Sequence, residues 1–543
     1  MLDETLTLAL ETIMCKKQAL IFVPSRASAE KTAEDISKQT KIYLLEQSEQ
    51  VLKGVSSPTK QCKRLANCVK KGIAFHHAGL LQKQRTLIED EFRAGNIKIV
   101  CCTPTLAAGM SLPAFRVIIK SLKRYAGRWG MNWIPVLEYH QMAGRAGRPE
   151  YESFGEAISI AKSEDERDDI HEKYIRGVPE DIYSKLAVEP VFRTYLLSLI
   201  ATGITSTKKK LIDFFSKTFW AYQFKDMDKI RMMIDDMLRL LEEYEFITIQ
   251  DIDSIDFSKG IGKRNDSEGS KSQAKGMLGF VTANSLVNNS KNDSSEENIF
   301  LKPTLIGRRV SELYLDPFTA NHLIQCLKNC TDEQVEVTAF SFLQMVSNTL
   351  EMVPPLRIKA REQDWVQEKL VAKYSELLQS EPTLYDPNYE DFINSIKTSL
   401  FFEAWIDEQG EDYLMEMYGV RPGEIFVKLA IADWLLYSSS ELARLMQFQP
   451  MLKEINKLRV RVKNGVKKEL LPLLKLKGVG RKRARKLFKN GFVDLGDLKK
   501  AELSDLVKIL GSRLAVDVKK QLGEEVKEIP KGRRKGQMSL EKY

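Results

Sequence analysis

The chain has 543 residues, 43% of them hydrophobic, so it can bury several cores, and its length predicts about three or four domains. It contains no run of 18 apolar residues and does not open with a signal peptide, so we expect a soluble, intracellular (cytoplasmic) protein. The seven cysteines form no C-x-x-C pair, which argues against a disulfide framework and against a zinc site.

The net charge of +9 is unevenly distributed along the chain. From residue 451 onward there are 27 Lys and Arg against 11 Asp and Glu, a net charge of +16, whereas residues 1–450 carry a net charge of −7. A basic end of this density predicts contact with nucleic acid or another polyanion. A basic surface that serves only solubility is the alternative.

Three short apolar runs predict strands of one sheet: residues 18–24 (QALIFVP), 72–77 (GIAFHH) and 97–102 (IKIVCC). Helical patterns separate these runs, and the alternation predicts an α/β fold, a parallel sheet with helices on both faces. Ligands bind such sheets at the carboxyl ends of the strands. Because Ser25 and Arg26, HHAGL and TPTLAAG fall at these ends, we expect a binding site there.

The segment QMAGRAGRP, residues 141–149, carries two arginines three positions apart, Arg145 and Arg148, each preceded by a glycine. On a helix this spacing would place both guanidinium groups on one face, one turn apart. Arginine is planar and always charged, so such a pair suits phosphoryl oxygens whose charge shifts during a reaction. A solvated basic helix start is the alternative.

Four segments in this order, QALIFVPSR, FHHAGL, TPTLAAGMSLPA and QMAGRAGRP, resemble motifs IV, IVa, V and VI of superfamily 2 helicases. The resemblance is greatest to the archaeal DNA-repair helicases related to the helicase region of animal polymerase theta. It implies a RecA-like domain that works with ATP and Mg²⁺, although Ser111 stands where the family often has Asn. The implied catalytic residues are Arg145 and Arg148, the implied ATP-binding residues are Gln141, Gly109 and Gly144, and the implied contacts to DNA phosphates are Ser25, Arg26 and Thr103.

Residues 122–135 (LKRYAGRWGMNWIP) predict a β-hairpin in which aromatic residues alternate with arginines around turn-forming glycines. In the resembled family a hairpin here separates the strands of the duplex, which would assign that role to Tyr125, Arg128 and Trp129. For Trp133 a wedge and a core anchor remain equally open.

An ATP-hydrolysing pair of RecA-like domains needs a G-x-x-x-x-G-K-[ST] phosphate loop and a metal-binding acidic motif. The sequence offers only residues 260–264 (GIGKR), without the hydroxyl residue, and 407–410 (DEQG), after a helical pattern, and we reject both. We therefore expect the C-terminal portion of a helicase, from the second RecA-like domain (1–186) onward. It would not hydrolyse ATP alone, and the first domain would be supplied in trans or lost by truncation.

Mainly α-helical domains are predicted after the RecA-like domain. Residues 187–315 predict a winged helix interrupted by a polar, disordered insertion at 258–298, which is either regulatory or tolerated filler. Residues 316–450 form amphipathic helices that resemble the ratchet bundle of these helicases. By that resemblance Trp434 would stack on a base and Lys428 would be a nearby basic contact, although Val427 occupies the expected position. A core tryptophan is the alternative.

Residues 451–525 predict a helix–hairpin–helix domain, in which Gly478 and Gly480 let backbone N–H groups approach a phosphate. Arg481, Arg483 and Arg485 then line the next helix and would bind DNA without reading its sequence. In the basic tail, 526–543, the spacing of Gln537, Leu540 and Tyr543 resembles a sliding-clamp peptide, or arises by chance.

The sequence thus predicts the C-terminal part of an ATP-dependent 3′-to-5′ DNA helicase that acts on single-stranded or branched DNA in repair and replication-fork processing. An ATP-independent DNA-binding or regulatory module and a relative of RNA helicases are the alternatives. No membrane partner is expected.

Overall fold

The computed structural model describes residues 3–53, 58–109, 112–125, 131–147, 153–251, 299–331 and 335–524. The chain divides into two compact units. The first contains Met1–Asp181, Lys397–Asp433 and Val460–Tyr543, and the second contains Ile182–Ile396 and Trp434–Arg459. The predicted division into four domains and a basic tail is finer than these units and stays a prediction.

Five parallel strands form the sheet of the RecA-like domain: β1 (Ala19–Phe22), β2 (Ile73–His76), β3 (Ile99–Cys102), β4 (Arg116–Ile119) and β7 (Glu156–Ser159). Their order across the sheet is β2-β3-β1-β4-β7, and Phe22 is in register with Cys102 and Ile119. The carboxyl ends of the strands therefore meet along one edge. Every residue of β1, β2 and β3 is buried, as expected of a parallel sheet covered by helices. The predicted α/β fold is confirmed.

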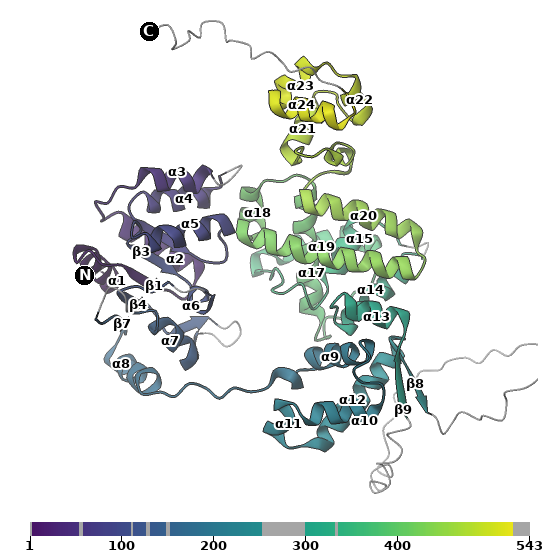
Figure 1. The fold of residues 1–543 in the computed structure, drawn as a ribbon, viewed down its shortest axis with the longest axis horizontal. Coiled ribbons are helices and arrows are strands. Elements are labelled where there is room, and N and C mark those ends of the chain that lie inside the picture. Colours follow the sequence, from purple (N-terminus) through teal and green to yellow (C-terminus); the bar gives the residue numbers. More distant parts are fainter. Residues whose placement is uncertain are drawn as a thin grey trace, which may run out of the picture. The chain divides into compact units, whose positions relative to one another are not determined.

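The helices of this domain follow the strands in the predicted alternation (Figure 1). They are α1 (Glu4–Met14), α2 (Arg26–Ser37), α3 (Leu45–Lys53), α4 (Lys60–Val69), α5 (Gln82–Arg93), α6 (Thr105–Gly109), α7 (Val136–Ala143) and α8 (Glu164–Ile170), which a π-helical turn, His171–Ile175, continues. Helix α2 packs against β2 and β3, whereas α1 and α7 pack against β4.

β4 and β7 are strands that the sequence patterns did not predict. β4 reads RVII and ends in three buried residues, so its apolar run carried a usable signal. β7 reads EAIS and lies half-buried at the sheet edge, where a short polar strand gives no periodicity. Between them, β5 (Lys123–Tyr125) and β6 (Met131–Trp133) pair antiparallel within the segment predicted to form a hairpin.

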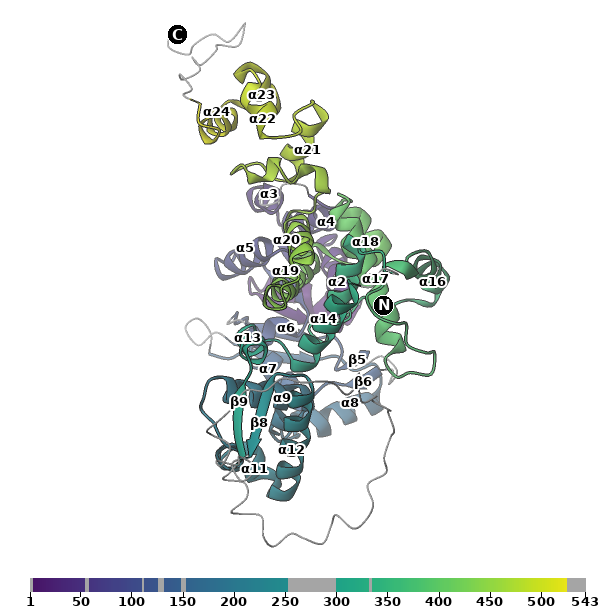
Figure 2. The same cartoon turned by 90° about the vertical axis from the view of Figure 1, so that its right-hand side faces the viewer.

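A winged helix occupies the start of the second unit. It consists of α9 (Glu189–Ala201), α10 (Lys208–Ser216), α11 (Phe219–Phe224), α12 (Met227–Glu243), β8 (Ile247–Asp251), β9 (Ile299–Pro303) and α13 (Leu305–Glu312). β8 and β9 pair antiparallel beside α9 and α12 (Figure 2). The predicted insertion at 258–298 lies between these strands and outside the described residues.

Helices continue through the next part of the chain, as the periodicity predicted: α14 (Pro317–Asn329), α15 (Ala339–Ser347), α16 (Gln363–Ala372), α17 (Tyr389–Ile406), α18 (Glu411–Tyr418), α19 (Pro422–Leu445) and α20 (Gln449–Asn464). Short 3-10 turns lie at Lys185–Ala187, Ala360–Glu362, Tyr374–Glu376, Lys468–Leu470 and Leu473–Lys475. Helix α18 ends where Gly419 adopts a left-handed conformation, φ +71°, and Pro422 opens α19, the usual positions of both residue types.

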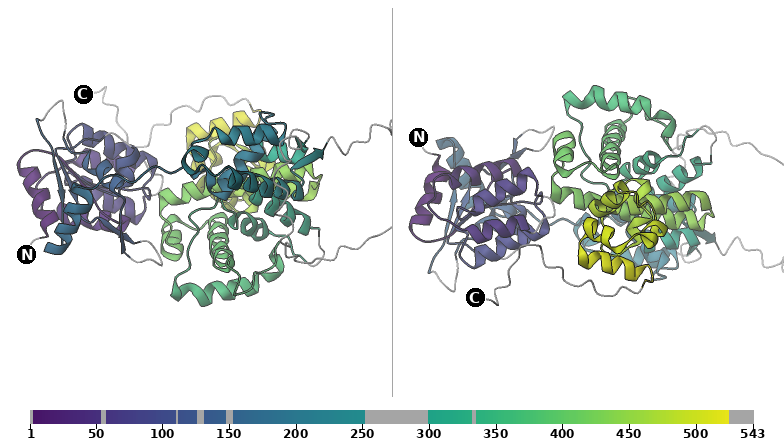
Figure 3. Two further views of the ribbon diagram at one scale, coloured as in Figure 1. Left: turned by 90° about the horizontal axis from the view of Figure 1, so that it is seen from below. Right: turned by 90° about the horizontal axis from the view of Figure 1, so that it is seen from above.

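The C-terminal helices α21 (Arg481–Lys489), α22 (Leu495–Lys500), α23 (Leu503–Leu510) and α24 (Ser512–Gln521) form one small cluster (Figure 3). They share a core of their own, in which Leu470, Leu487, Leu506 and Val518 are fully buried. This part of the chain therefore folds around its own apolar centre.

Six of the seven cysteines are buried and Cys15 is exposed, with no disulfide among them. Burial raises the pKa of the Cys68 thiol to about 12 and that of Cys330 to about 11. They are core thiols. Within the described part of the chain, no helix is long and apolar enough to cross a membrane.

Candidate functional site

A pocket of about 770 Å³ opens at the carboxyl edge of the RecA-like sheet. The loops after β1, β2 and β3, the hairpin strand β5, helix α7 and the residue before α19 all contribute to its lining. The lining residues are Pro24, Ser25, Arg26, Ala27, Ala78, Thr103, Pro104, Thr105, Arg124, Pro135, Leu137, Glu138, Gln141 and Arg421. The cavity lies at the ends of the strands, where a site was predicted, and three of the predicted DNA contacts and one predicted ATP contact, Gln141, line it; their roles stay predictions.

Local structure fixes the hydroxyl groups of the pocket. Ser25 is the N-cap of α2, where its side chain accepts the backbone N–H of Ser28 at 3.1 Å, a geometry that serine favours. Thr103 follows β3, and its hydroxyl lies 2.9 Å from that of Thr105. Ser25 therefore has a structural role in addition to its place in the pocket lining.

Arg421 and Arg26 are held by carboxylates from distant segments. Arg421 Nε lies 3.3 Å from Glu30 Oε1, and Arg26 forms an ion pair with Glu424. The two guanidinium groups also affect each other, because burial and then the charge of Arg421 lower the pKa of Arg26. Arg421 was not among the predicted site residues, and nothing in its local sequence, between a glycine turn and Pro422, signals binding.

Glu30 is the buried centre of this network, with 4% of its surface exposed. Its carboxylate lies 2.8 Å from Gln61 Nε2, 3.2 Å from His77 Nε2 and 2.5 Å from Arg64 Nη1. Burial alone would raise its pKa, but the hydrogen bonds from His77 and Gln61 and the charges of Arg421 and Arg64 lower it to about 2. The carboxylate therefore stays ionised at all physiological pH values.

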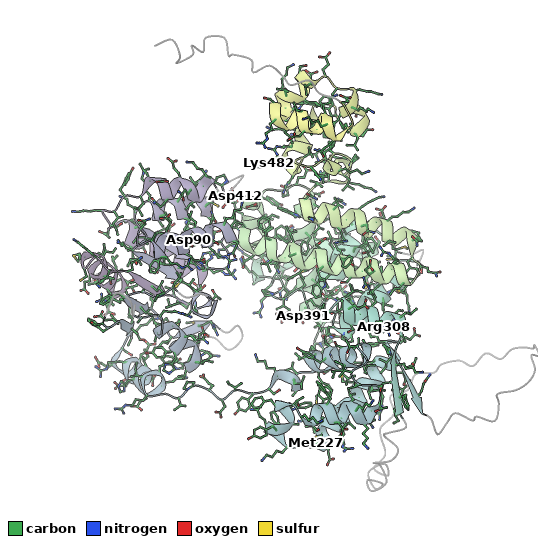
Figure 4. All side chains as sticks on the ribbon, viewed as in Figure 1. Asp90, Met227, Arg308, Asp391, Asp412 and Lys482 are labelled. Atoms are coloured by element: carbon green, nitrogen blue, oxygen red, sulfur yellow. The ribbon has the colours of Figure 1, made fainter. Side chains whose placement is uncertain are left out.

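A close backbone contact joins the start of α19 to the loop after β2. The N–H of Gly423 donates to the carbonyl oxygen of Gly79 at 3.0 Å. A Cβ at Gly423 would collide with the carbonyl oxygens of Ala78 and Leu80, so only glycine allows this approach. Nearby, the Lys60 N–H donates at 3.2 Å to Asp412 on α18, which Figure 4 labels.

The two arginines of QMAGRAGRP do not share a helix face as predicted, because α7 ends at Ala143 and Gly144 caps it. Arg145 lies in the following turn, and Gly147 has φ +95°, a conformation that favours glycine. The turn pairs with Ala114, whose N–H donates to Arg145 O at 2.9 Å. Glycines that end a helix thus override the helical spacing of the arginines. Arg148 lies outside the described residues.

Arg145 connects the segment QMAGRAGRP to the segment TPTLAAGMSLPA. Its Nη2 donates to the carbonyl oxygen of Ala107, in the helix that ends at Gly109, at 2.5 Å, while its buried Nε–H has no hydrogen-bond partner among the described residues. An unpartnered cationic donor fits a phosphate oxygen. No cluster of acidic, histidine or cysteine side chains able to hold a metal occurs in the described ranges. The surroundings of Arg145 are compatible with its predicted place beside ATP, which stays a prediction, and no Mg²⁺ ligands are evident in these ranges.

The contacts of Trp133 in the hairpin favour its role as a core anchor. Its ring packs 5.9 Å from Tyr174, and Lys123 lies 4.1 Å above it, while Tyr174 donates its hydroxyl to Ile134 O at 2.6 Å. Trp133 thus anchors the hairpin to the domain. The backbone of Tyr125 ends β5, its side chain is not described, and Arg128 and Trp129 lie outside the described residues, so their strand-separating role stays a prediction.

In the helical region Trp434 is half-buried, and its indole N–H donates to Leu313 O at 3.1 Å. Lys428 is buried, and burial lowers its pKa to about 8, while Val427 is 58% exposed. The DNA contacts of Trp434 and Lys428 stay predictions, but neither side chain is a simple surface group.

At the basic end Gly478 has φ +86° and Gly480 caps α21, as a helix–hairpin–helix requires. The arginines that follow differ in their surroundings. Arg485 makes a bidentate pair with Glu408, at 2.8 and 2.5 Å, and also reaches Glu469. Arg481 lies 5.0 Å above the ring of Trp405 and donates to Gln409 O at 2.8 Å.

Arg483 is exposed and donates only locally, to Gly478 O at 2.8 Å. The sequence analysis assigned all three arginines the same role, whereas in the structure Arg481 and Arg485 have partners in the distant segment 405–411. The predicted clamp residues Gln537, Leu540 and Tyr543 lie outside the described residues.

Four family models match the chain in succession. They are the helicase conserved C-terminal domain at residues 3–150, a helix-turn-helix domain at 155–248, domain 4 of archaeal helicases at 340–465 and a SAM-like helix-hairpin-helix tandem at 470–524. This succession of domains is that of a superfamily 2 DNA helicase.

Proteins named ATP-dependent DNA helicase Hel308 are similar over nearly the whole chain. That of Methanocella arvoryzae is 34% identical over 538 residues, covering 97% of this chain and 66% of its own length. The Pyrococcus horikoshii protein is also 34% identical, with 67% of its length covered, and the Caldivirga maquilingensis protein is 31% identical over 548 residues. The chain belongs to the archaeal Hel308 family of DNA helicases, and it spans about two thirds of the length of these relatives.

Proposed function

We propose that this chain is the DNA-handling portion of an ATP-dependent helicase that moves 3′ to 5′ along single-stranded DNA and acts on branched DNA in repair and replication-fork processing. The observation that carries the proposal is the shared pocket at the carboxyl edge of the sheet. Ser25, Arg26, Thr103 and Arg124 come from different motifs and from the hairpin, yet all line one cavity. Cations and hydroxyl groups that converge in this way suit the phosphates of a strand.

In this proposal Arg145 and Arg148 face an ATP molecule whose phosphates and Mg²⁺ are bound mainly by a first RecA-like domain, in the same polypeptide or in another. Bound ATP supplies the free energy for closing the two domains. Arg145 links its guanidinium to the carbonyl of Ala107, and so holds the end of α7 against the segment that also presents Thr103 and Thr105. The groups that face the nucleotide and the groups that face the DNA strand would therefore move together.

The remaining parts have supporting roles in the same proposal. The hairpin, anchored by Trp133, would open the duplex, and Trp434 would stack on a base of the translocated strand. The helix–hairpin–helix would hold the strand as it leaves, through Gly478, Gly480 and Arg483. The helix–hairpin–helix domain favours DNA over RNA as the substrate.

Reconstitution tests this proposal. The purified chain is mixed with a separately produced first RecA-like domain of a Hel308 relative, and ATP hydrolysis is measured with and without single-stranded DNA. We expect DNA-stimulated hydrolysis only in the mixture, and its loss when Arg145→Ala replaces the wild-type chain. Two folded partners that bind DNA without hydrolysing ATP would favour the alternative, an ATP-independent binding module. Competition by an RNA strand of the same sequence tests the choice of DNA.

A further inference from the structure

Among the described residues, three arginines line the pocket, and of these Arg421 alone comes from outside the helicase motifs and the hairpin. It lies almost 300 residues further along the chain than Arg124, immediately before α19. We propose that Arg421 binds a phosphodiester group of the nucleic-acid strand in this pocket, so that the start of α19 forms part of the strand-binding surface. The inference rests on the proposed function and extends it to a residue and a segment that the motifs do not include.

The chemistry of the pocket favours the backbone of a strand over its bases. Its lining contains three arginines, Arg26, Arg124 and Arg421, against one carboxylate, Glu138, and it adds the hydroxyl groups of Ser25, Thr103 and Thr105. Among the described residues that line the pocket, none has an aromatic side chain on which a base could stack. Guanidinium forks beside hydroxyl donors bind phosphate oxygens without reading sequence.

The position of Arg421 is fixed before any ligand arrives. Its Nε faces the buried carboxylate of Glu30 at 3.3 Å, and its backbone N–H donates to Glu424 at 2.9 Å. The adjacent Gly423–Gly79 hydrogen bond ties the backbone beside Arg421 to the loop after β2. In this proposal the two terminal nitrogens of the guanidinium bind the ligand, since Nε is directed to Glu30 and Arg421 lines the cavity. A cation ordered in advance loses little entropy when it binds an anion.

The surrounding charges also favour an anion. Arg26 lies close enough for the charge of Arg421 to lower its pKa, and both charges lower the pKa of His77, after the larger effect of burial. Two like charges beside one cavity repel each other, and a bound phosphate relieves that repulsion. Glu30 and Glu424 hold the two arginines in place, and neither carboxylate is among the pocket-lining residues.

A methylphosphonate scan tests the assignment. A labelled oligothymidine is prepared as a series in which a single linkage is replaced by neutral methylphosphonate, and its affinity for the full chain is measured by fluorescence anisotropy. We expect one linkage, or two adjacent ones, at which neutralisation weakens binding to the wild-type chain about tenfold, as for a hydrogen bond between charged groups. In the Arg421→Gln variant, the neutral linkage at the same position should leave the affinity almost unchanged, because the contact is already lost. Arg444→Gln, on the exposed side of the same helix, is the matched control and should behave as wild type.

Equal losses at every linkage in the wild type and in Arg421→Gln would overturn the proposal. If Arg421→Gln unfolds at a lower temperature, Arg421→Lys keeps the charge beside Glu30, and it should retain part of the sensitivity at the same linkage. Binding of pyrophosphate is measured as well. If its affinity depends on Arg421 while no methylphosphonate linkage weakens oligonucleotide binding, the ligand of Arg421 is a free phosphate group. That result would also overturn the proposal. A wild-type chain that fails to bind the oligonucleotide at all would instead contradict the proposed function.

Discussion

The carboxyl edge of the RecA-like sheet and the C-terminal helix–hairpin–helix both collect arginines, but in opposite ways. In the C-terminal domain five cations crowd into residues 481–486, and two of them, Arg481 and Arg485, are held by groups at 405–411 and by Glu469. At the sheet edge Arg26, Arg124 and Arg421 are far apart in sequence, and although each also pairs with a carboxylate, all three line one pocket. Charge density along a sequence therefore does not measure which cations a ligand can reach.

The largest effect we expect comes from breaking the sheet-edge assembly at its backbone contact. Gly423→Ala places a Cβ against the carbonyl oxygens of Ala78 and Leu80, and such overpacking costs about 1–3 kcal/mol of stability. Thermal unfolding should shift down, and hydrogen exchange should rise in residues 411–424. Gly410→Ala is the matched control, because a Cβ there meets nothing within 4 Å. Equal effects of the two substitutions would contradict the role of Gly423.

Lowering the pH should destabilise the sheet edge more than the C-terminal domain, because buried neutral histidines occur only at the sheet edge. Burial lowers the pKa of His76 and His77 at the sheet edge, whereas residues 397–543 contain no histidine. A histidine whose folded pKa is depressed contributes stability that is complete above its unfolded pKa, near 6.5, and is lost as the pH falls through the folded value.

Each such histidine lowers the free energy of unfolding by up to about 1.4 kcal/mol per pH unit below 6.5. Limited proteolysis at pH 7.5 and 5.5 should therefore show cleavage increasing within residues 58–109 and not within 470–524. His77→Gln should reduce the difference. Glu30, with a folded pKa of about 2, contributes stability that is lost only as the pH falls from about 4.5 towards 2, outside this range. Unchanged cleavage of both regions would show that these histidines do not limit stability.

A smaller effect is expected at the basic end. Arg485→Ala removes the bidentate pair with Glu408 and should lower the free energy of unfolding by about 1 kcal/mol, the range for a partly exposed charge-assisted pair. Glu408→Ala should cost a similar amount, and the double variant little more, since both remove one interaction. Additive losses in denaturant unfolding would contradict the pairing.

The smallest effect concerns the salt dependence of DNA binding. Arg483 is exposed and has only a local partner, so Arg483→Ala should flatten the slope of log K against log salt by about 0.7, the value of one phosphate contact on a single strand. Arg485→Ala should change the slope less, because Glu408 and Glu469 already neutralise that side chain. A larger change for Arg485 would show that DNA displaces these carboxylates.

Much of the fold was predictable because it depends on local patterns. Short apolar runs followed by polar residues predicted β1, β2 and β3. The glycines at 478 and 480 predicted the helix–hairpin–helix. The strand β7 was missed because a short, half-buried edge strand lacks periodicity. The prediction that Arg145 and Arg148 share a helix face was wrong because it assumed a helix that runs through both residues, whereas α7 ends at Ala143, before either arginine.

The site was predictable only where a motif supplied the residue. Ser25, Arg26, Thr103 and Gln141 were found in this way, and all four line the pocket. Glu30 and Arg421 were missed because their roles arise from contacts between segments that are distant in sequence. Single-sequence reasoning has no pattern for such contacts, since neither residue stands in a distinctive local context.

The burial of the thiols has a practical consequence for spectroscopy. Only Cys15, at the end of α1, is exposed, while the other six cysteines are buried and therefore shielded from thiol reagents. A maleimide dye should therefore attach at one place in the native chain without any cysteine being replaced. Energy transfer from that dye to an acceptor on one end of an oligonucleotide would then report the direction in which the strand lies.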